Sequence, residues 1–172
     1  YQKWHMAYNH YGDSEVDMGK YDTPCETAFA VGCVMLLRGE VLRKIGGFIN
    51  DYFIYWEEPD WCLRAKYLGY STWYEPASIV YHNTRAEVRG KESPLFIYMH
   101  FRNFLIFAKY HYKGAQRIQF WFVLPFHILK RWKIMSSSGN KVAVKAMFNG
   151  LVDYFKGYRG KELLKERGLI IK

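Results

Sequence analysis

Three carboxylates stand close together in one short stretch of this 172-residue chain. Glu57, Glu58 and Asp60 lie among large aromatic residues in the sequence Tyr-Phe-Ile-Tyr-Trp-Glu-Glu-Pro-Asp-Trp-Cys-Leu-Arg of residues 52–64. An ionised carboxylate can accept a proton as a general base or bind a cationic ligand. The stretch is therefore the first candidate for a functional site.

Pro59 predicts where a helix begins. Proline has a fixed φ and no N–H to lose, so it is favoured at the first helical position, and Glu58 is expected to cap the helix. The helix should run to about Leu68, where Gly69 ends it. Asp60 then lies in the first turn, where the helix dipole favours its ionised form. An acid-capped helix without chemistry explains the same residues, and both interpretations stay open.

Arg64 follows one helical turn after Asp60. At roughly 100° per residue, Arg64, Asp60 and Glu57 fall near one side of the helix, so we expect Arg64 to hold one of the two acids by an ion pair. Such a pair would still orient the site.

An apolar run precedes the acidic stretch. Residues 29–37, Phe-Ala-Val-Gly-Cys-Val-Met-Leu-Leu, predict a buried strand. Gly32 inside the run indicates either a bulge or a place where another group approaches the backbone closely. A short helix is expected over residues 40–45, ended by Gly46 and Gly47.

Short β-type runs follow the acidic helix. Residues 71–75 and 78–82 predict two strands, whereas residues 1–26 show no lasting period and predict a largely irregular segment. His82 ends the second run and precedes a polar loop at 83–93. A lone histidine is usually a surface or core residue, but a strand end beside a loop also suits a ligand or a catalyst.

The C-terminal part of the chain has a helical pattern. The helix expected over residues 94–112 carries Arg102 and Asn103 in its middle, and we expect this polar pair to face back toward the domain. The apolar segment 118–132 is shorter than the roughly 20 residues that a membrane-spanning helix needs. After a Ser/Gly linker, a basic amphipathic helix is expected over residues 141–158.

The segment 118–132 suits an interfacial helix at a membrane surface. Six apolar or aromatic residues would lie in the lipid boundary, namely Trp121, Phe122, Leu124, Phe126, Leu129 and Trp132. Lys130, Arg131 and Lys133 would lie at the level of the head groups. A buried core helix is the alternative.

The charge of the chain is unevenly distributed. Residues 1–100 hold 10 lysines and arginines against 13 aspartates and glutamates, a net charge of −3, whereas residues 101–172 hold 15 against 3, a net charge of +12. The basic part is expected to seek an anionic surface. Its cations lie on apolar amphipathic helices and not in a recognisable RNA- or DNA-binding motif, so we expect a membrane surface as partner and no nucleic acid.

Four motifs, in order along the chain, resemble the C-terminal half of bacterial family 2 glycosyltransferases of the rhamnosyltransferase-like branch. They are the segment 32–48 from Gly-Cys-Val-Met-Leu to Gly-Gly-Phe, the acidic stretch 52–64, Leu-Gly-Tyr at 68–70 and Val-Tyr-His at 80–82. The resemblance spans about half of the chain.

This resemblance implies a GT-A fold. The expected architecture is the acceptor-side half of an α/β GT-A domain with few short strands over residues 1–112, followed by basic amphipathic helices over residues 113–172 that form a membrane-associated tail. The nucleotide-binding half of such a domain, with its Asp-x-Asp metal motif, has no counterpart in this sequence. The chain begins at Tyr1 without a targeting leader, so it looks like a trimmed piece that is inactive by itself.

By resemblance, the acidic stretch supplies the catalytic base of an inverting transferase. Such an enzyme moves a sugar from a nucleotide-sugar donor to a saccharide or lipid-linked acceptor and must deprotonate the attacking hydroxyl. Glu58 stands where the family usually has Asp and is the expected base, with Asp60 as the fallback and Glu57 in support.

The resemblance also implies a divalent metal, Mn²⁺ or Mg²⁺, that neutralises the departing diphosphate. The missing N-terminal half would hold most of it, with His82 as a ligand from this chain. Arg85 is a candidate clamp for the diphosphate. Tyr55 and Trp56 would stack on a sugar face or belong to the core. The expected substrate contacts are Gly32, Tyr55, Trp56, Arg64 and Arg85.

The sequence thus predicts a fragment of a glycosyltransferase for cell-surface polysaccharide synthesis. The protein is expected to be cytoplasmic and peripheral on the inner face of the cell membrane. The alternative is a non-catalytic module that binds a membrane surface, in which the acids only cap a helix.

Overall fold

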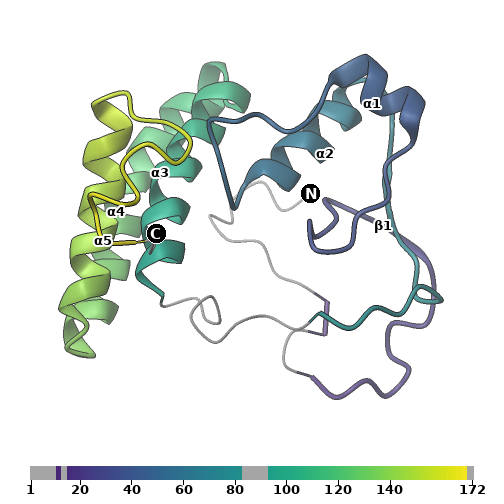
Figure 1. Cartoon of the computed structure of the whole chain (residues 1–172), viewed down its shortest axis with the longest axis horizontal. Coiled ribbons are helices and arrows are strands. Elements are labelled where there is room, and N and C mark those ends of the chain that lie inside the picture. The colour runs from purple at the N-terminus through teal and green to yellow at the C-terminus, as the bar shows by residue number, and fades with distance from the viewer. Residues whose placement is uncertain (1–10, 13–14, 83–92, 170–172) are drawn as a thin grey trace. The chain divides into compact units, whose positions relative to one another are not determined.

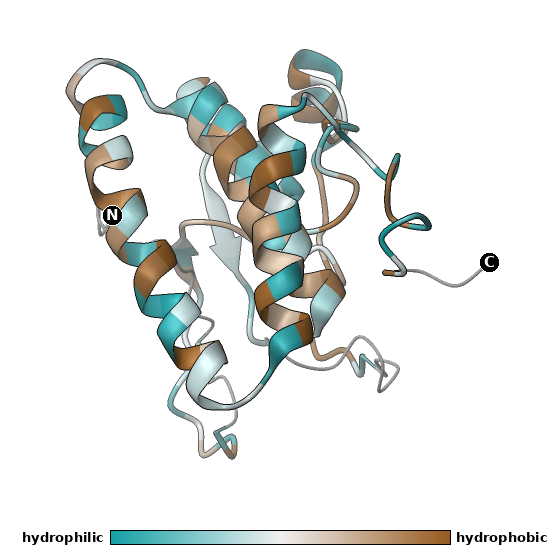
Figure 2. Cartoon of the chain, turned by 90° about the vertical axis from the view of Figure 1, so that its left-hand side faces the viewer, coloured by the Kyte–Doolittle hydropathy of each residue, from teal (hydrophilic) through white to brown (hydrophobic). Residues whose placement is uncertain are grey.

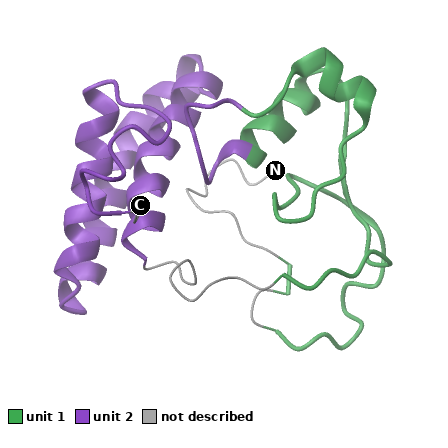
Figure 3. Ribbon diagram, viewed as in Figure 1, with its two compact units in different colours: residues 1–48, 58–83 green, residues 49–57, 84–172 purple. Residues whose placement is uncertain are grey.

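The computed structural model describes residues 11–12, 15–82 and 93–169. These residues form five helices and one two-stranded sheet, so the described structure is mixed α/β and mostly helical (Figure 1). The chain divides into two compact units, which we describe separately (Figure 3). The first unit comprises residues 1–48 and 58–83, and the second comprises residues 49–57 and 84–172. Neither unit border falls at residue 112, and the functional boundary expected there stays a prediction.

A two-stranded antiparallel sheet joins distant parts of the first unit. Strand β1 (Cys25–Thr27) pairs with β2 (Thr72–Tyr74), and Cys25 lies opposite Tyr74. Strand β2 confirms the first of the two strands expected after the acidic helix. Strand β1 begins at Cys25, at the end of the segment expected to be largely irregular, and was not predicted because a strand of three residues is too short to show alternation.

Two predicted strands do not form within the described residues. Residues 29–37 contain a turn, in which the N–H of Val34 donates to the carbonyl oxygen of Val31 (3.1 Å). Residues 78–82 are exposed and take part in no strand pairing. An apolar run becomes a strand only where a partner strand lies beside it, and these two runs have no such partner among the described residues.

Helices α1 (Gly39–Ile45) and α2 (Glu57–Tyr67) carry the core of the first unit, although Glu57 itself is assigned to the second unit. Four buried side chains form this core cluster, namely Val41, Trp61, Cys62 and Ala65. Half-buried apolar side chains pack against the cluster, namely Phe29, Met35, Leu37, Ile45 and Tyr70. Three apolar side chains of the run 29–37 thus cover this core.

Glycines end both helices, as predicted. Gly46 (φ 74°) follows α1 and Gly69 (φ 85°) follows the end of α2, and L side chains rarely adopt such backbone angles. The start of α2 differs from the prediction, because the helix begins at Glu57 and not at Pro59. Glu58 is thus a residue of the first turn and not its cap. The N–H groups of the first turn have no intrahelical partner, so proline is tolerated at the third position as well as the first.

The second unit contains three helices that confirm the helical C-terminal pattern (Figure 1). They are α3 (Pro94–His111), α4 (Gly114–Ser137) and α5 (Lys141–Phe155). Ser93 caps α3, because its side-chain oxygen accepts a hydrogen bond from the N–H of Phe96 (3.1 Å).

A glycine contact and a buried carboxylate hold α3 and α5 together. A Cβ at position 150 of α5 would collide with the carbonyl oxygen of Tyr98, so only glycine allows this approach. The buried carboxylate of Asp153 accepts a hydrogen bond from the hydroxyl of Tyr98 (3.0 Å) and two from the guanidinium of Arg167 (3.0 and 2.6 Å). Burial raises the pKa of Tyr98 to about 12, so its hydroxyl stays a donor.

Helix α4 has one buried face and one exposed face. Phe120, Leu124 and Met135 are buried, whereas the other five residues expected at a membrane surface are exposed. Leu124 is 5% exposed, so its assignment to the lipid boundary is wrong. None of the helices in the described parts of the chain combines the length and the apolar character needed to cross a membrane.

Candidate functional site

Glu58 reaches from the first turn of α2 to the turn at Gly32. The N–H of Gly32 donates a hydrogen bond to Oε1 of Glu58 (3.0 Å). A Cβ at position 32 would lie 2.5 Å from the same oxygen, so a larger residue would have to displace the carboxylate. The predicted close approach at Gly32 is confirmed, and the approaching group is the half-buried side chain of Glu58.

Asp60 is buried and paired with Arg64. Its exposed fraction is 0%, and its Oδ2 accepts a hydrogen bond from Nε of Arg64 (2.8 Å), one helical turn away. The expected ion pair is thereby confirmed. Because the guanidinium already engages this carboxylate, Asp60 is poorly placed to take a proton from a substrate.

The rest of the Arg64 guanidinium completes the end of helix α1. Its Nη1 donates to the carbonyl oxygen of Ile45 (2.8 Å) and its Nη2 to that of Gly47 (2.9 Å). The last carbonyls of a helix have no intrahelical donor, and a cation there also meets the negative end of the helix dipole. Arg64 therefore fixes α2 against α1, and this structural role accounts for the residue without a substrate.

Cys62 lies in the core beneath the same helix turn. Burial raises the pKa of its thiol, which works against ionisation. A thiol that stays protonated is a weak nucleophile and a weak metal ligand, so Cys62 serves packing.

The loop that leads into α2 has an unusual backbone. Phe53, Tyr55 and Trp56 have φ angles of 67°, 65° and 80°. Residues other than glycine rarely occupy this left-handed region, and three within four positions require a framework that holds them.

Asn103 and Arg102 of α3 provide that framework within the second unit. The side-chain nitrogen of Asn103 lies 2.9, 2.8 and 2.8 Å from the carbonyl oxygens of Tyr52, Ile54 and Tyr55, so its two N–H groups serve three acceptors. Arg102 donates to the carbonyl of Tyr52 (3.1 Å) through Nη2, and to Oδ1 of Asn103 (3.1 Å) through Nε. Both side chains are fully buried, which confirms that this polar pair faces inward.

The aromatic residues beside the carboxylates belong to the packing of the second unit. Trp56 is 6% exposed, and its ring lies 5.0 Å from that of Phe104 and 5.2 Å from that of Phe107. Tyr55 is half-buried and meets Phe96 edge to face, with the ring centroids 5.0 Å apart. For Trp56, the core alternative is therefore the better description.

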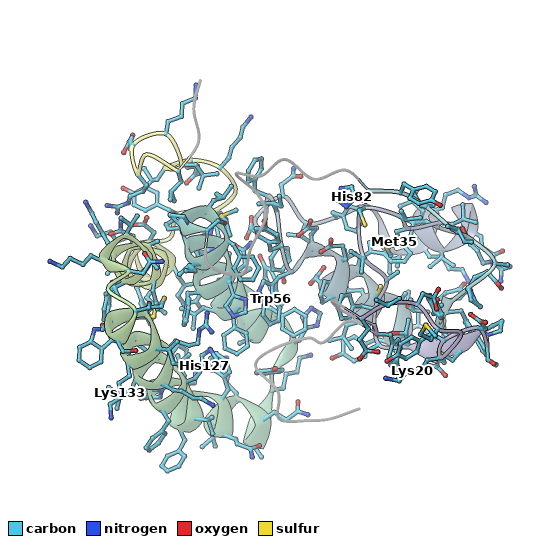
Figure 4. All side chains as sticks on the ribbon, turned by 90° about the horizontal axis from the view of Figure 1, so that it is seen from below. Lys20, Met35, Trp56, His82, His127 and Lys133 are labelled. Carbon is cyan, nitrogen blue, oxygen red and sulfur yellow. The ribbon has the colours of Figure 1, made fainter. Side chains whose placement is uncertain are left out.

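Of the candidate metal and diphosphate residues, only His82 lies within the described part of the chain. His82 is exposed and belongs to the first unit (Figure 4). Arg85 lies outside the described residues. Within residues 11–12, 15–82 and 93–169, no three His, Cys, Asp or Glu side chains come together as a metal site. The described residues therefore do not form a metal site by themselves, and we derive no step through a metal.

The structure joins four of the predicted site residues in two pairs within the first unit, namely Gly32 with Glu58 and Asp60 with Arg64. Tyr55, Trp56 and Glu57 belong to the second unit. The sequence did not indicate the strained loop, because a positive φ at an aromatic residue leaves no signature. A polar pair in the middle of an aromatic helix was the one available signal for Arg102 and Asn103.

The chain matches no family model, no curated protein and no solved structure. A function must therefore be argued from the residues themselves.

Proposed function

We propose that this chain is the acceptor-side part of an inverting glycosyltransferase with a GT-A fold, in which Glu58 is the catalytic base. The observation that carries the proposal is the difference between the neighbouring acids. Asp60 is buried against Arg64, whereas Glu58 is half-buried and held by the backbone N–H of Gly32. Of these two acids, Glu58 is thus the one that combines a fixed position with access to solvent.

In the proposed reaction, the hydroxyl of an acceptor sugar gives its proton to the Glu58 carboxylate. The hydroxyl oxygen attacks the anomeric carbon of the nucleotide sugar, and the bond from that carbon to the diphosphate oxygen breaks. The electron pair of that bond leaves with the nucleoside diphosphate, and the configuration inverts. The hydrogen bond from Gly32 restricts the rotamer of Glu58, which places the base before the acceptor arrives.

The donor side of the reaction lies elsewhere in this proposal. A nucleotide-binding half would bind the nucleotide sugar, and a divalent ion held there would neutralise charge on the diphosphate. The acceptor would be a saccharide or a lipid-linked saccharide, and the enzyme would work at the cytoplasmic face of the membrane. His82 and Arg85 remain the proposed contacts to the metal and the diphosphate.

A transfer assay tests the proposal. Full-length protein that contains this chain is incubated with radiolabelled UDP-, dTDP- and GDP-sugars and with membranes that supply acceptors. We expect label from one donor to enter a saccharide or lipid-linked product, with release of the nucleoside diphosphate. If none of the donors binds and none is consumed, the chain is not part of a glycosyltransferase.

A non-catalytic interaction module is the second candidate function. The pairing of Asp60 with Arg64 and the burial of Trp56 favour it, because all three residues have structural roles that need no substrate. This candidate predicts binding to a surface without sugar transfer, so the same assay separates the two.

A further inference from the structure

Helix α4 presents an exposed apolar face, which we call the α4 face, formed by Ile118, Phe122, Phe126, Leu129 and Trp132. Their exposed fractions are 74%, 70%, 63%, 50% and 40%. At 100° per residue these five side chains fall within a sector of roughly 120°, the width of the apolar stripe of an amphipathic helix. In a packed helix such a stripe faces the core, whereas here it faces away from it.

The opposite side of α4 is the one that packs on the second unit. The ring of Phe120 lies 5.0 Å from that of Phe104 of α3, and Leu124 and Met135 are 5% and 4% exposed. The helix therefore has two apolar faces, one for the core and one that the described residues leave in solvent. Brown residues recur along α4 in Figure 2 accordingly.

Cations lie in and beside the α4 face. At the same 100° per residue, Lys133 falls within the α4 face and Lys130 lies about 40° beyond one edge, and both are exposed (Figure 4). Helix α4 contains no Asp or Glu, and none occurs anywhere between Glu92 and Asp153. Helix α4 itself therefore supplies no negative charge to offset these cations.

The geometry points to an anionic phospholipid bilayer as the occupant of the α4 face. The five apolar side chains would enter the boundary between head groups and acyl chains, with α4 parallel to the membrane plane, and the cations would meet lipid phosphates. A second copy of the chain fits poorly, because pairing two α4 faces would bring the like charges of Lys130 and Lys133 together. The inference stands whether or not the chain transfers sugar.

The surface continues onto helix α5. Trp121 at the edge of the α4 face meets Phe155, with ring centroids 6.2 Å apart, and Phe155 is 67% exposed. Tryptophan is favoured at the interface between head groups and acyl chains, which fits its place at this edge.

Vesicle sedimentation tests the inference with the chain itself. Protein is mixed with vesicles of phosphatidylcholine alone or of phosphatidylcholine mixed with phosphatidylglycerol. We expect binding to the anionic vesicles that weakens as salt rises. The double variant Phe122→Ala/Phe126→Ala should weaken this binding by about tenfold or more, since two large apolar side chains no longer enter the lipid. The double variant Lys130→Gln/Lys133→Gln should weaken binding to anionic vesicles and reduce its salt dependence.

Matched controls come from the first unit. Leu36→Ala removes a fully exposed apolar side chain and Arg43→Gln an exposed cation, and both should bind vesicles as the wild-type chain does. Circular dichroism and thermal unfolding should show that all variants fold, because every altered side chain is exposed.

Three outcomes would overturn the inference. The first is a monomeric chain that binds neither kind of vesicle. The second is binding that the Phe122→Ala/Phe126→Ala variant leaves unchanged, which would indicate a purely electrostatic surface. The third is concentration-dependent self-association that this variant abolishes while the wild-type chain ignores vesicles, which would assign the face to a second copy.

Discussion

The N–H of Gly32 donates a 3.0 Å hydrogen bond to Oε1 of Glu58, and the absence of a side chain at position 32 is what lets the carboxylate approach the backbone. The two residues are 26 positions apart in the chain. Their contact fixes one carboxylate of the acidic stretch, and in the proposed function that carboxylate is the base.

Gly32→Ala should therefore act on Glu58 more than on folding. The added Cβ would lie 2.5 Å from Oε1, so the carboxylate must move. A displacement of this kind should lower sugar transfer by about 10- to 100-fold. Gly47→Ala is the matched control, because a Cβ there meets nothing within 4 Å, and it should leave transfer unchanged. Equal activity of the two alanine variants would show that the contact between Gly32 and Glu58 is not needed for sugar transfer.

Arg64→Ala should unfold the first unit more easily. The substitution removes the ion-pair partner of the buried Asp60 carboxylate and two donors from the end of α1. We expect the free energy of unfolding to fall by about 3 kcal/mol or more, measured by urea denaturation. The exposed pair of Arg38 and Glu40 supplies the control, since Arg38→Ala should change stability by less than about 1 kcal/mol. Similar losses for both variants would contradict the structural role of Arg64.

Asn103→Ala should release the loop that precedes α2. Three carbonyl oxygens lose their shared donor, and three residues with positive φ lose the group that holds them. We expect a loss of about 2–4 kcal/mol in the free energy of unfolding, and faster amide hydrogen exchange over residues 52–56. Asn149→Ala on α5 is the control, because it removes the same side chain from a half-buried position that donates none of these three hydrogen bonds, and it should leave exchange in the loop unchanged. Unchanged exchange in the loop of the Asn103→Ala variant would show that other contacts maintain it.

Two histidines should make the second unit sensitive to acid. Burial lowers the pKa of His100 to about 3 and that of His127 to about 4. The nearby positive charge of Arg131 also lowers both pKa values. The unfolded chain takes up these protons near the ordinary value of 6.5, before the folded chain does. Stability is thus complete above pH 6.5 and falls as the pH drops toward 4, by up to about 1.4 kcal/mol per pH unit for each histidine.

The double variant His100→Phe/His127→Phe isolates this effect. Phenylalanine preserves the ring packing against Phe104, which contacts both histidines. Thermal unfolding between pH 7 and about 4 should show a shallower loss of stability for the variant than for the wild-type chain. Parallel curves would assign the acid sensitivity to other groups.

The spacing and the helix propensities of neighbouring residues predicted several features of this chain correctly. The glycines after α1 and α2, the helices of the second unit and the pairing of Asp60 with Arg64 follow from spacing and propensity. These features depend on residues within a few positions of one another, which is the range in which helix geometry acts.

The features that were predicted wrongly or missed depend on contacts between residues that are far apart in the chain. The run 29–37 has the composition of a strand, but its turn at Val31 to Val34 and its packing on the core cluster are set by α2. The strained loop before α2 exists because Asn103, about 50 positions away, holds its carbonyls. Neither arrangement could be read from local sequence, since the stabilising partner is not a neighbour in the chain.

Glu58→Gln tests the central claim most directly. The amide keeps the size of the side chain and can still accept the hydrogen bond from Gly32, but it cannot take up a proton. In the complete enzyme that the proposed function implies, we predict that the variant binds the nucleotide sugar as the wild type does and transfers sugar at least about 100-fold more slowly. Glu75→Gln, at an exposed acid of the first unit outside the proposed site, is the control and should keep most of the activity. Transfer at the wild-type rate by the Glu58→Gln variant would show that Glu58 is not the base.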